Sequence, residues 1–124
     1  HVLRDIAAAR TAGADLVIPF MHWGWERERQ PSARQRRLAH LMIDSGADAV
    51  VGGHPHVTQG DESYAGKPII YSLGNFVFDG FDTEAEKTGW LLRLRVAKEG
   101  VLGWEVVPAH MDAEGLPQRQ VTPK

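Results

Sequence analysis

Residues 47–57 read Ala-Asp-Ala-Val-Val-Gly-Gly-His-Pro-His-Val, an apolar run followed by two glycines and two closely spaced histidines. The apolar part predicts a buried strand, because short β-branched runs bounded by turn residues are typical of strands. Pro55 disfavours the helical region for the residue before it, so we expect His54 to be extended. In an extended chain His54 and His56 point to the same face. We expect the two glycines to supply the sharp turn after the strand.

A strand–helix–strand unit precedes these histidines. Residues 15–20 predict a first strand, and residues 32–45 predict the helix that leads to the second strand. Ser32 is a good N-cap with Gln35 at the capping-box spacing, and Gly46 is a suitable stop. Such units have parallel strands and a right-handed crossover. The carboxyl ends of both strands are therefore expected at one edge of the sheet, where open α/β proteins bind ligands.

Histidines follow both strand ends, which predicts a metal site. His22 comes after the first strand, while His54 and His56 come after the second. The pair can reach one metal ion, or each ring can reach one of two ions about 3.5–4 Å apart. We interpret all three as metal ligands and catalytic candidates. His40 and His110 have no second ligand nearby in sequence, and we interpret them as structural.

Four further residues near these strand ends have two interpretations each. Glu26 can orient the imidazole four residues before it or be a solvated loop charge. Trp23, with Trp25, can form the wall of a substrate pocket or cover the core. Asn75 ends a later strand, where it can line the same edge or form the turn.

A run of arginines occupies the loop after His22 and the start of the following helix, at Arg27, Arg29, Arg34, Arg36 and Arg37. Guanidinium groups bind anions in a planar, bidentate manner. The run, with Arg27 nearest the histidine, predicts a docking surface for an anionic small-molecule or polymer substrate. The alternative is an ordinary solvated helix face.

The composition is that of a globular domain or part of one, with 124 residues, 43% hydrophobic and 24% charged residues. A formal net charge of −2 gives no reason to expect a nucleic-acid partner. The absence of cysteine excludes disulfides and thiolate zinc sites. No apolar stretch approaches the roughly 18 residues of a membrane span. Because the chain starts at His1, within a helical pattern over residues 2–12, we expect it to be part of a longer protein.

The pattern changes after residue 57. Residues 67–73, 89–97 and 101–107 predict strands, the last two joined by a hairpin turn at residues 98–100. Residues 112–124 are expected to form an edge or a loose tail. The predicted fold class is therefore α/β, with βα units followed by antiparallel strands, a domain over residues 1–111 and a tail over 112–124.

Four motifs occur in the order and spacing of a known family: His22-Trp23-Gly24 with Glu26, Gly46-Ala47-Asp48, Gly53-His54-Pro55-His56-Val57 with Gln59, and Tyr71-Ser72-Leu73-Gly74-Asn75-Phe76 with Phe78-Asp79. Over residues 1–107 the chain resembles the bacterial capsule synthesis protein CapA family. That family takes part in poly-γ-glutamate synthesis and is related to the calcineurin-like metallophosphoesterases.

The resemblance implies the C-terminal part of a β-sandwich flanked by helices, with two divalent metal ions (Mn, Fe or Zn) at the strand ends. By the same resemblance His22 matches a single histidine ligand, and His54 and His56 match a terminal Gly-His-x-His pair. Gly53 stands where relatives often have another histidine, which is not expected to be a ligand. The family also implies a location in the cell envelope or outside the cell, and a partnership with capsule-synthesis machinery.

The resemblance also implies missing ligands. The family's aspartates and Asn-His motif, which bridge and complete the metal pair, are expected before residue 1. Local carboxylates that could substitute are Asp61, Glu62, Asp79 and Asp82, none at a matched position. Three imidazoles alone could hold one zinc ion with an open position. The two main functional hypotheses are a metal-dependent, phosphoesterase-like hydrolase and a non-catalytic accessory protein that binds anionic polymer during capsule assembly or export. A third is a fragment without independent activity, and with part of the ligand set expected elsewhere we expect these 124 residues alone to be inactive.

Overall fold

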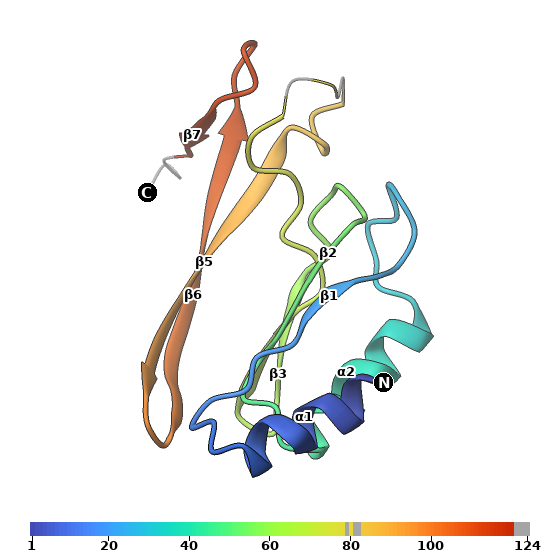
Figure 1. Ribbon diagram of the computed structural model, residues 1–124. Coiled ribbons are helices and arrows are strands. Elements are labelled where there is room, and N and C mark those ends of the chain that lie inside the picture. The colour runs from blue at the N-terminus through green and yellow to red at the C-terminus, as the bar shows by residue number, and fades with distance from the viewer. Residues whose placement is uncertain (79, 81–82, 121–124) are drawn as a thin grey trace.

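A four-stranded sheet lies between two helices and a long β-hairpin in the computed structural model, which describes residues 1–78, 80 and 83–120 (Figure 1). The elements in chain order are α1 (Val2–Thr11), β1 (Phe20–His22), α2 (Ala33–Asp44), β2 (Val50–Gly53), β3 (Asp61–Tyr64), β4 (Lys67–Ile70), β5 (Thr88–Ala97), β6 (Gly100–Met111) and β7 (Pro117–Arg119).

The first sheet has the strand order β1-β2-β4-β3. β1, β2 and β4 run parallel, and β3 is antiparallel to β4. The register places His22 opposite Gly53, so β1 and β2 end side by side. The helices cover one face of this sheet with a core of Ile6, Ala39, Met42, Ile43, Val50, Ile69 and Tyr71. Burial of these side chains is the main source of stability here.

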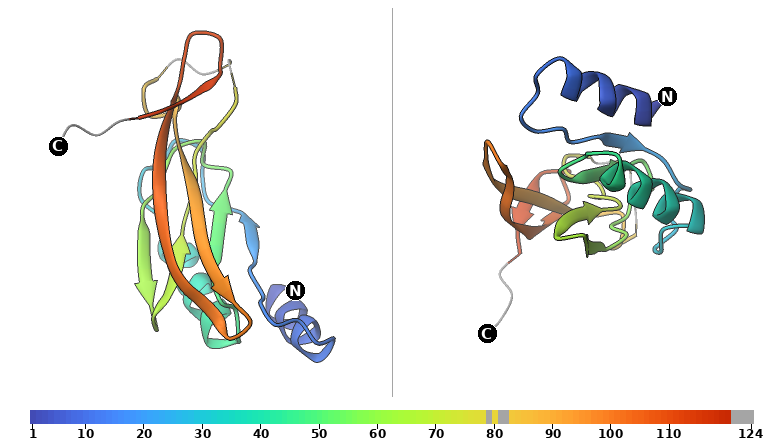
Figure 2. Two further views of the ribbon diagram at one scale, coloured as in Figure 1. Left: turned by 90° about the vertical axis from the view of Figure 1, so that its left-hand side faces the viewer. Right: turned by 90° about the horizontal axis from the view of Figure 1, so that it is seen from below.

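The second sheet, of order β5-β6-β7, is antiparallel and crosses the face opposite the helices (Figure 2). Phe20 and Val51 of the first sheet line an apolar space of about 410 Å³ together with Leu91 and Leu92 of β5. A hydrogen bond from the Trp90 N–H to the Leu73 carbonyl (2.7 Å) links the two sheets. The α/β fold class is confirmed, with parallel β1, β2 and β4 followed by antiparallel strands, and the arrangement is consistent with a partial metallophosphoesterase-like domain.

The capping box of α2 is confirmed. The Gln35 N–H donates to the Ser32 hydroxyl (3.1 Å), and the Ser32 N–H donates to Gln35 Oε1 (2.9 Å). Gly46 follows the helix with φ 112°, a conformation that favours glycine. Within the described residues no helix is long and apolar enough to cross a membrane.

The predicted strand over residues 15–20 is wrong in its position, because regular pairing begins only at Phe20. Pro19 has no N–H to donate. The Val17 N–H donates to the Asp48 carboxylate (2.8 Å) instead of to a neighbouring strand. His22 is consequently the last residue of β1 and does not lie in the loop beyond it.

Other strand boundaries also differ from the prediction. The strand over 67–73 pairs regularly only over 67–70, and the strand predicted to end at 107 continues to Met111. β3 was not predicted, because its turn into β4 is Ala65-Gly66 (φ 52° and 77°), which lacks the Asn-Gly signal of such turns. Residues 117–119, within the expected edge or tail, form the edge strand β7.

A buried ion pair fastens α1 to the connection between α2 and β2. Asp48 is only 5% exposed. Its Oδ2 accepts hydrogen bonds from Arg10 Nη2 (2.5 Å) and the Val17 N–H (2.8 Å). Arg10 Nη2 also donates to the Gly46 carbonyl (2.7 Å). Removing Arg10 would leave a buried carboxylate with a single donor.

We expect Arg10→Ala to lower the free energy of unfolding by about 2–3 kcal/mol. Breaking a fully buried ion pair costs roughly 3–5 kcal/mol, and the loss here should be smaller because Arg10 is partly exposed. Urea denaturation measures the change. The control is Arg4→Ala on the same helix: Arg4 is exposed, makes no hydrogen bond or ion pair within the described residues, and should cost less than about 0.5 kcal/mol. Similar losses in the two variants would contradict the role given to the Asp48 pair.

Candidate metal centre

The three predicted histidines lie together at the carboxyl ends of β1 and β2, where the loops that follow both strands meet at one sheet edge (Figure 1). The ring centroids of His22 and His54 are 4.2 Å apart, with the planes tilted by 36°. Those of His54 and His56 are 5.8 Å apart. The parallel strand–helix–strand unit therefore brings these rings to one place.

The group of possible ligand atoms that lie near one another contains Glu26 together with His54 and His56, and does not contain His22. One ligand atom each from Glu26, His54 and His56 lie within 4.8 Å of one another. Ligands of one zinc ion lie about 3–4 Å apart, because each bond is about 2.0–2.2 Å long, so side-chain adjustments of about 1 Å would give bonding geometry. A carboxylate and two imidazoles suit zinc, iron or manganese. This donor set fits a divalent cation, and it differs from the predicted set in having Glu26 in place of His22.

Asn75 orients the His56 ring. His56 Nδ1 lies 2.9 Å from Asn75 Oδ1. The Asn75 amide nitrogen donates to the carbonyls of His56 (3.1 Å) and Glu86 (2.9 Å), which fixes the orientation of the amide. Since Oδ1 can only accept, Nδ1 carries the hydrogen, and a neutral His56 has its lone pair on Nε2. This is the arrangement by which outer residues fix the tautomer of a metal-binding histidine.

The backbone of the candidate site adopts conformations that side chains normally avoid. Among the described residues only four that are not glycine have positive φ, and three of them lie here: Arg27 (67°), His54 (101°) and His56 (63°). The prediction of an extended His54 is therefore wrong. β2 continues to Gly53, so the chain must turn immediately afterwards, and the Arg27 N–H holds the Pro55 carbonyl at 2.8 Å. Such residues cost about 1–3 kcal/mol each and cluster at functional sites.

The two glycines do not make the turn that the sequence predicts, because both belong to β2. Gly52 instead allows close packing. A Cβ at this position would lie 2.2 Å from the Tyr71 carbonyl oxygen and 2.3 Å from Trp23 Nε1. These two atoms form a hydrogen bond of 2.8 Å over the glycine. Trp23 is thereby anchored on the core beside the site.

Glu86 is a site residue that the sequence analysis missed. Its carboxylate is buried, and its Oε2 lies 3.5 Å from the Nε of Arg27, whose own side chain is largely exposed. Oε2 has no hydrogen-bond partner within the described residues, whereas Oε1 accepts from the Thr83 hydroxyl (2.7 Å). The available signal was the Thr-x-x-Glu spacing of residues 83–86, which is that of a capping box. Glu86 thus holds Arg27 beside the histidine loop.

The substitute carboxylates are not brought to the histidines. Asp61 and Glu62 belong to β3, at the opposite edge of the first sheet. Glu62 pairs with His40 Nε2 (2.9 Å) and accepts a hydrogen bond from the Tyr71 hydroxyl. Burial acts to raise the pKa of Glu62, but these hydrogen bonds outweigh it and lower the pKa. Asp79 and Asp82 lie outside the described residues.

Both histidines interpreted as structural have carboxylate partners. His40 contacts Glu62, as above, and stacks on Tyr64 with ring centroids 4.1 Å apart. His110 Nε2 lies 2.7 Å from Glu84 Oε2.

The arginines of the run lie in different surroundings. Arg27 pairs with Glu86, whereas Arg29 and Arg36 line a polar cleft of about 590 Å³ beside Glu62 and Tyr71. Arg34 lines a separate cleft of about 360 Å³ that includes His22. The run thus contributes to two clefts, and its role as a docking surface for an anionic substrate stays a prediction.

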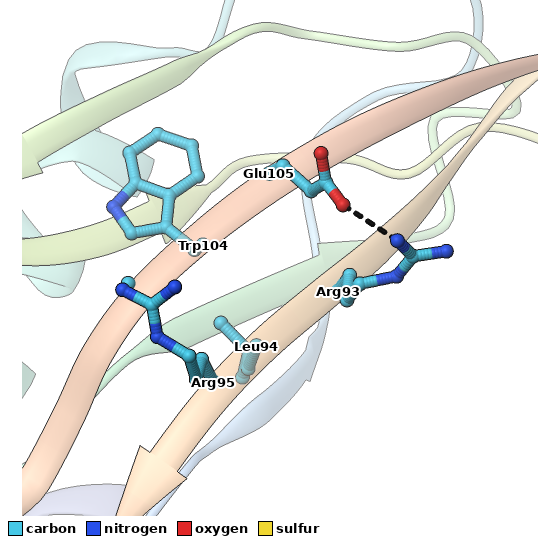
Figure 3. A pocket seen from close by; sticks show the side chains of 6 residues that line it. Arg93, Leu94, Arg95, Trp104 and Glu105 are labelled. Carbon is cyan, nitrogen blue, oxygen red and sulfur yellow. Dashed lines mark hydrogen bonds and ion pairs between the residues drawn. The ribbon is translucent and has the colours of Figure 1, made fainter.

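A cleft of about 500 Å³ on the β5–β6 hairpin contains none of the candidate site residues. It is lined by Arg93, Leu94, Arg95, Gly103, Trp104 and Glu105 (Figure 3). Arg93 Nη1 and Glu105 Oε1 form a cross-strand ion pair of 2.8 Å. Arg95 adds a second positive charge beside this pair, and the cleft shares no lining residue with the histidine cluster.

Comparison with known proteins identifies relatives over most of the chain. Residues 1–80 match a family described as bacterial capsule synthesis protein PGA_cap. The PGA biosynthesis protein CapA of Bacillus subtilis is 46% identical over 95 residues, 77% of this chain and 25% of that protein. The capsule biosynthesis protein CapA of Bacillus anthracis is 41% identical over 120 residues, 94% of this chain and 29% of that protein.

A more distant relative is a probable polyglutamine synthesis accessory protein of Mycobacterium tuberculosis. It is 37% identical over 81 residues, which are 63% of this chain and 21% of that protein. The chain thus spans about a quarter of the length of the curated relatives that it matches.

Proposed function

The chain belongs to the PGA_cap family of bacterial capsule synthesis proteins, and on that basis we propose that it carries part of a metal-dependent hydrolase site acting on an anionic substrate in capsule polymer synthesis. The observation that carries the proposal is the donor set of Glu26, His54 and His56, with ligand atoms within 4.8 Å of one another. Two loops from neighbouring strand ends supply it.

The residues around this donor set have distinct tasks in the proposed site. Glu26, His54 and His56 would hold a divalent cation, and when bound the cation supplies Lewis acidity. Asn75 fixes the His56 tautomer through its amide oxygen. His22 packs its ring against His54 and restricts the orientation of that ligand. Arg27, which Glu86 holds in place, adds positive charge near the loop for an anionic substrate.

The positive φ angles at His54 and His56 support a functional role for the loop. The surrounding hydrogen bonds, including the one from the Arg27 N–H to the Pro55 carbonyl, offset the conformational cost of these angles. A loop that served only to connect β2 and β3 would not need strained histidines.

Metal-dependent turnover tests the proposal. We expect the full-length protein to hydrolyse a phosphodiester or a γ-linked glutamyl peptide, to lose this activity after chelation, and to regain it with manganese or zinc. Calcium is the matched control, because it prefers six to eight oxygen ligands and should not restore activity at a site with two imidazoles. Turnover that is unaffected by chelation would contradict the proposal.

A second candidate function, a non-catalytic accessory role in polymer assembly, is favoured by one observation. The relative from Mycobacterium tuberculosis is described as an accessory protein. Binding of anionic polymer without turnover, in protein that contains its metal, would favour this function over hydrolysis.

A further inference from the structure

The cleft beside His22 is a candidate for the place where substrate enters the site. It has a volume of about 360 Å³, within the range of about 300–1,000 Å³ typical of ligand pockets. It lies between the end of β1, the loop after it and the first turns of α2. Its lining residues are Met21, His22, Trp23, Gly24, Trp25, Ser32, Arg34, Gln35 and Leu38.

We infer that this cleft is a substrate subsite for a carboxylate carried on a methylene-rich chain, with Arg34 binding the carboxylate and Trp25 covering the methylenes. The inference rests on the proposed function, because a substrate subsite presupposes that the site of His54 and His56 acts on a substrate. Its physical basis is separate and consists of the shape, the charge and the exposure of residues in the cleft.

Two tryptophans line the cleft, and the side chain of one of them, Trp25, is largely exposed to solvent. Trp25 is 75% exposed, whereas Trp23 is half-buried and hydrogen-bonded to the Tyr71 carbonyl. An exposed indole leaves a large apolar face in water, and such faces mark binding sites when they border a concave surface. Since Met21 and Leu38 also line the cleft, its walls suit a chain of methylene groups.

Among the described residues, Arg34 is the one arginine or lysine that lines this cleft. It is exposed and makes no hydrogen bond or ion pair within the described residues. No carboxylate lines the cleft, in contrast to the cleft of Arg29 and Arg36, which also contains Asp61 and Glu62. A ligand carboxylate would therefore meet a guanidinium without an internal competitor.

Two of the residues that line the cleft, Gly24 and Gln35, pack closely against each other. Gly24 has φ 75°, and a Cβ there would lie 2.8 Å from Gln35 Oε1. Gln35 is fixed by the Ser32 N–H and by its own hydrogen bond to Gln59 Oε1 (2.9 Å). His22, whose ring contacts His54, is also among the residues that line the cleft, so the cleft adjoins the candidate metal centre.

Binding of a short γ-linked glutamate oligomer to the full-length protein, measured by calorimetry, tests this inference. We expect Arg34→Ala to weaken binding about 10- to 100-fold, as loss of a charged hydrogen bond does, with partial recovery in Arg34→Lys. Trp25→Ala should weaken it about tenfold. The matched control is Arg37→Ala: Arg37 is an exposed arginine of the same helix whose side chain makes no hydrogen bond or ion pair within the described residues, and its loss should change affinity less than about twofold.

Further measurements separate the alternatives. The carboxamide counterpart of the oligomer should bind as weakly as the oligomer binds to Arg34→Ala, because it carries no negative charge, and phenyl phosphate, which lacks the methylene chain, should bind more weakly than the oligomer. Equal losses in Arg34→Ala and Arg37→Ala would show general charge attraction and overturn the inference, as would a preference for carboxamide or phosphate.

Metal content distinguishes this inference from the proposed function. Arg34→Ala should keep the metal content of the unmodified protein. Arg34-dependent binding in a protein that never contains metal would overturn the hydrolase proposal but uphold the subsite. Metal-dependent turnover with no Arg34 dependence would uphold the hydrolase proposal and overturn the subsite.

Discussion

Replacing His54 with alanine is expected to abolish stoichiometric binding of divalent metal by the full-length protein. His54 belongs to the three-residue donor set and also contacts His22, so its loss removes one ligand and the support of another ring. Removal of outer residues alone typically lowers metal affinity about 10- to 100-fold, and removal of a ligand should exceed this. Metal content per mole of purified protein, determined by mass spectrometry, measures the effect.

The control for this experiment is His40→Ala. His40 lies on α2 and contacts Glu62 and Tyr64, away from the donor set, so its replacement should leave the metal content unchanged. His56→Ala should behave like His54→Ala. Equal metal content in His54→Ala and the unmodified protein would refute the candidate metal centre.

Gly52→Ala is expected to cause the largest loss of stability among single-methyl additions to β2. The new Cβ would lie 2.2 Å from the Tyr71 carbonyl oxygen, which belongs to the backbone and cannot rotate away. It would also break the hydrogen bond that Trp23 makes there. Overpacking of this kind costs about 1–3 kcal/mol, and the lost hydrogen bond adds about 1 kcal/mol. Chemical denaturation should show a decrease of about 3 kcal/mol.

The neighbouring glycine gives a matched control. A Cβ at Gly53 would have only the Phe20 ring within 4 Å, at 3.8 Å, which is an ordinary contact. Gly53→Ala should therefore change stability by less than about 1 kcal/mol. If the two variants unfold at the same denaturant concentration, the close packing of Trp23 over Gly52 does not contribute as described.

The convergence of the histidines could be predicted from sequence because it depends on topology alone. An apolar run, a capped helix and a second apolar run require parallel strands, and parallel strands place their ends together. The prediction needed no side-chain detail. The family resemblance and the strand–helix–strand pattern agree on this part of the chain, which is also the part that the family match covers.

The local geometry of the loop could not be predicted in the same way. Pro55 favours an extended His54 in isolation, but the backbone hydrogen bond from Arg27 and the end of β2 at Gly53 override that preference. The place of Glu26 in the donor set depends on the path of its loop, which has no periodic signal. Glu86 reaches Arg27 across 59 positions of sequence, a contact that no local pattern encodes.

The amide pair of Gln35 and Gln59 makes the start of a helix part of the site's architecture. Gln35 Oε1 caps α2 through the Ser32 N–H, while its nitrogen holds Gln59, whose own nitrogen donates to the Glu28 carbonyl (2.8 Å). A helix cap is ordinarily a local device whose loss costs about 1 kcal/mol. Here the cap sets the spacing between the loop that carries Glu26 and the loop that carries His56. A displacement of this helix terminus would move both loops, so the cap also fixes the positions of the candidate ligands relative to one another.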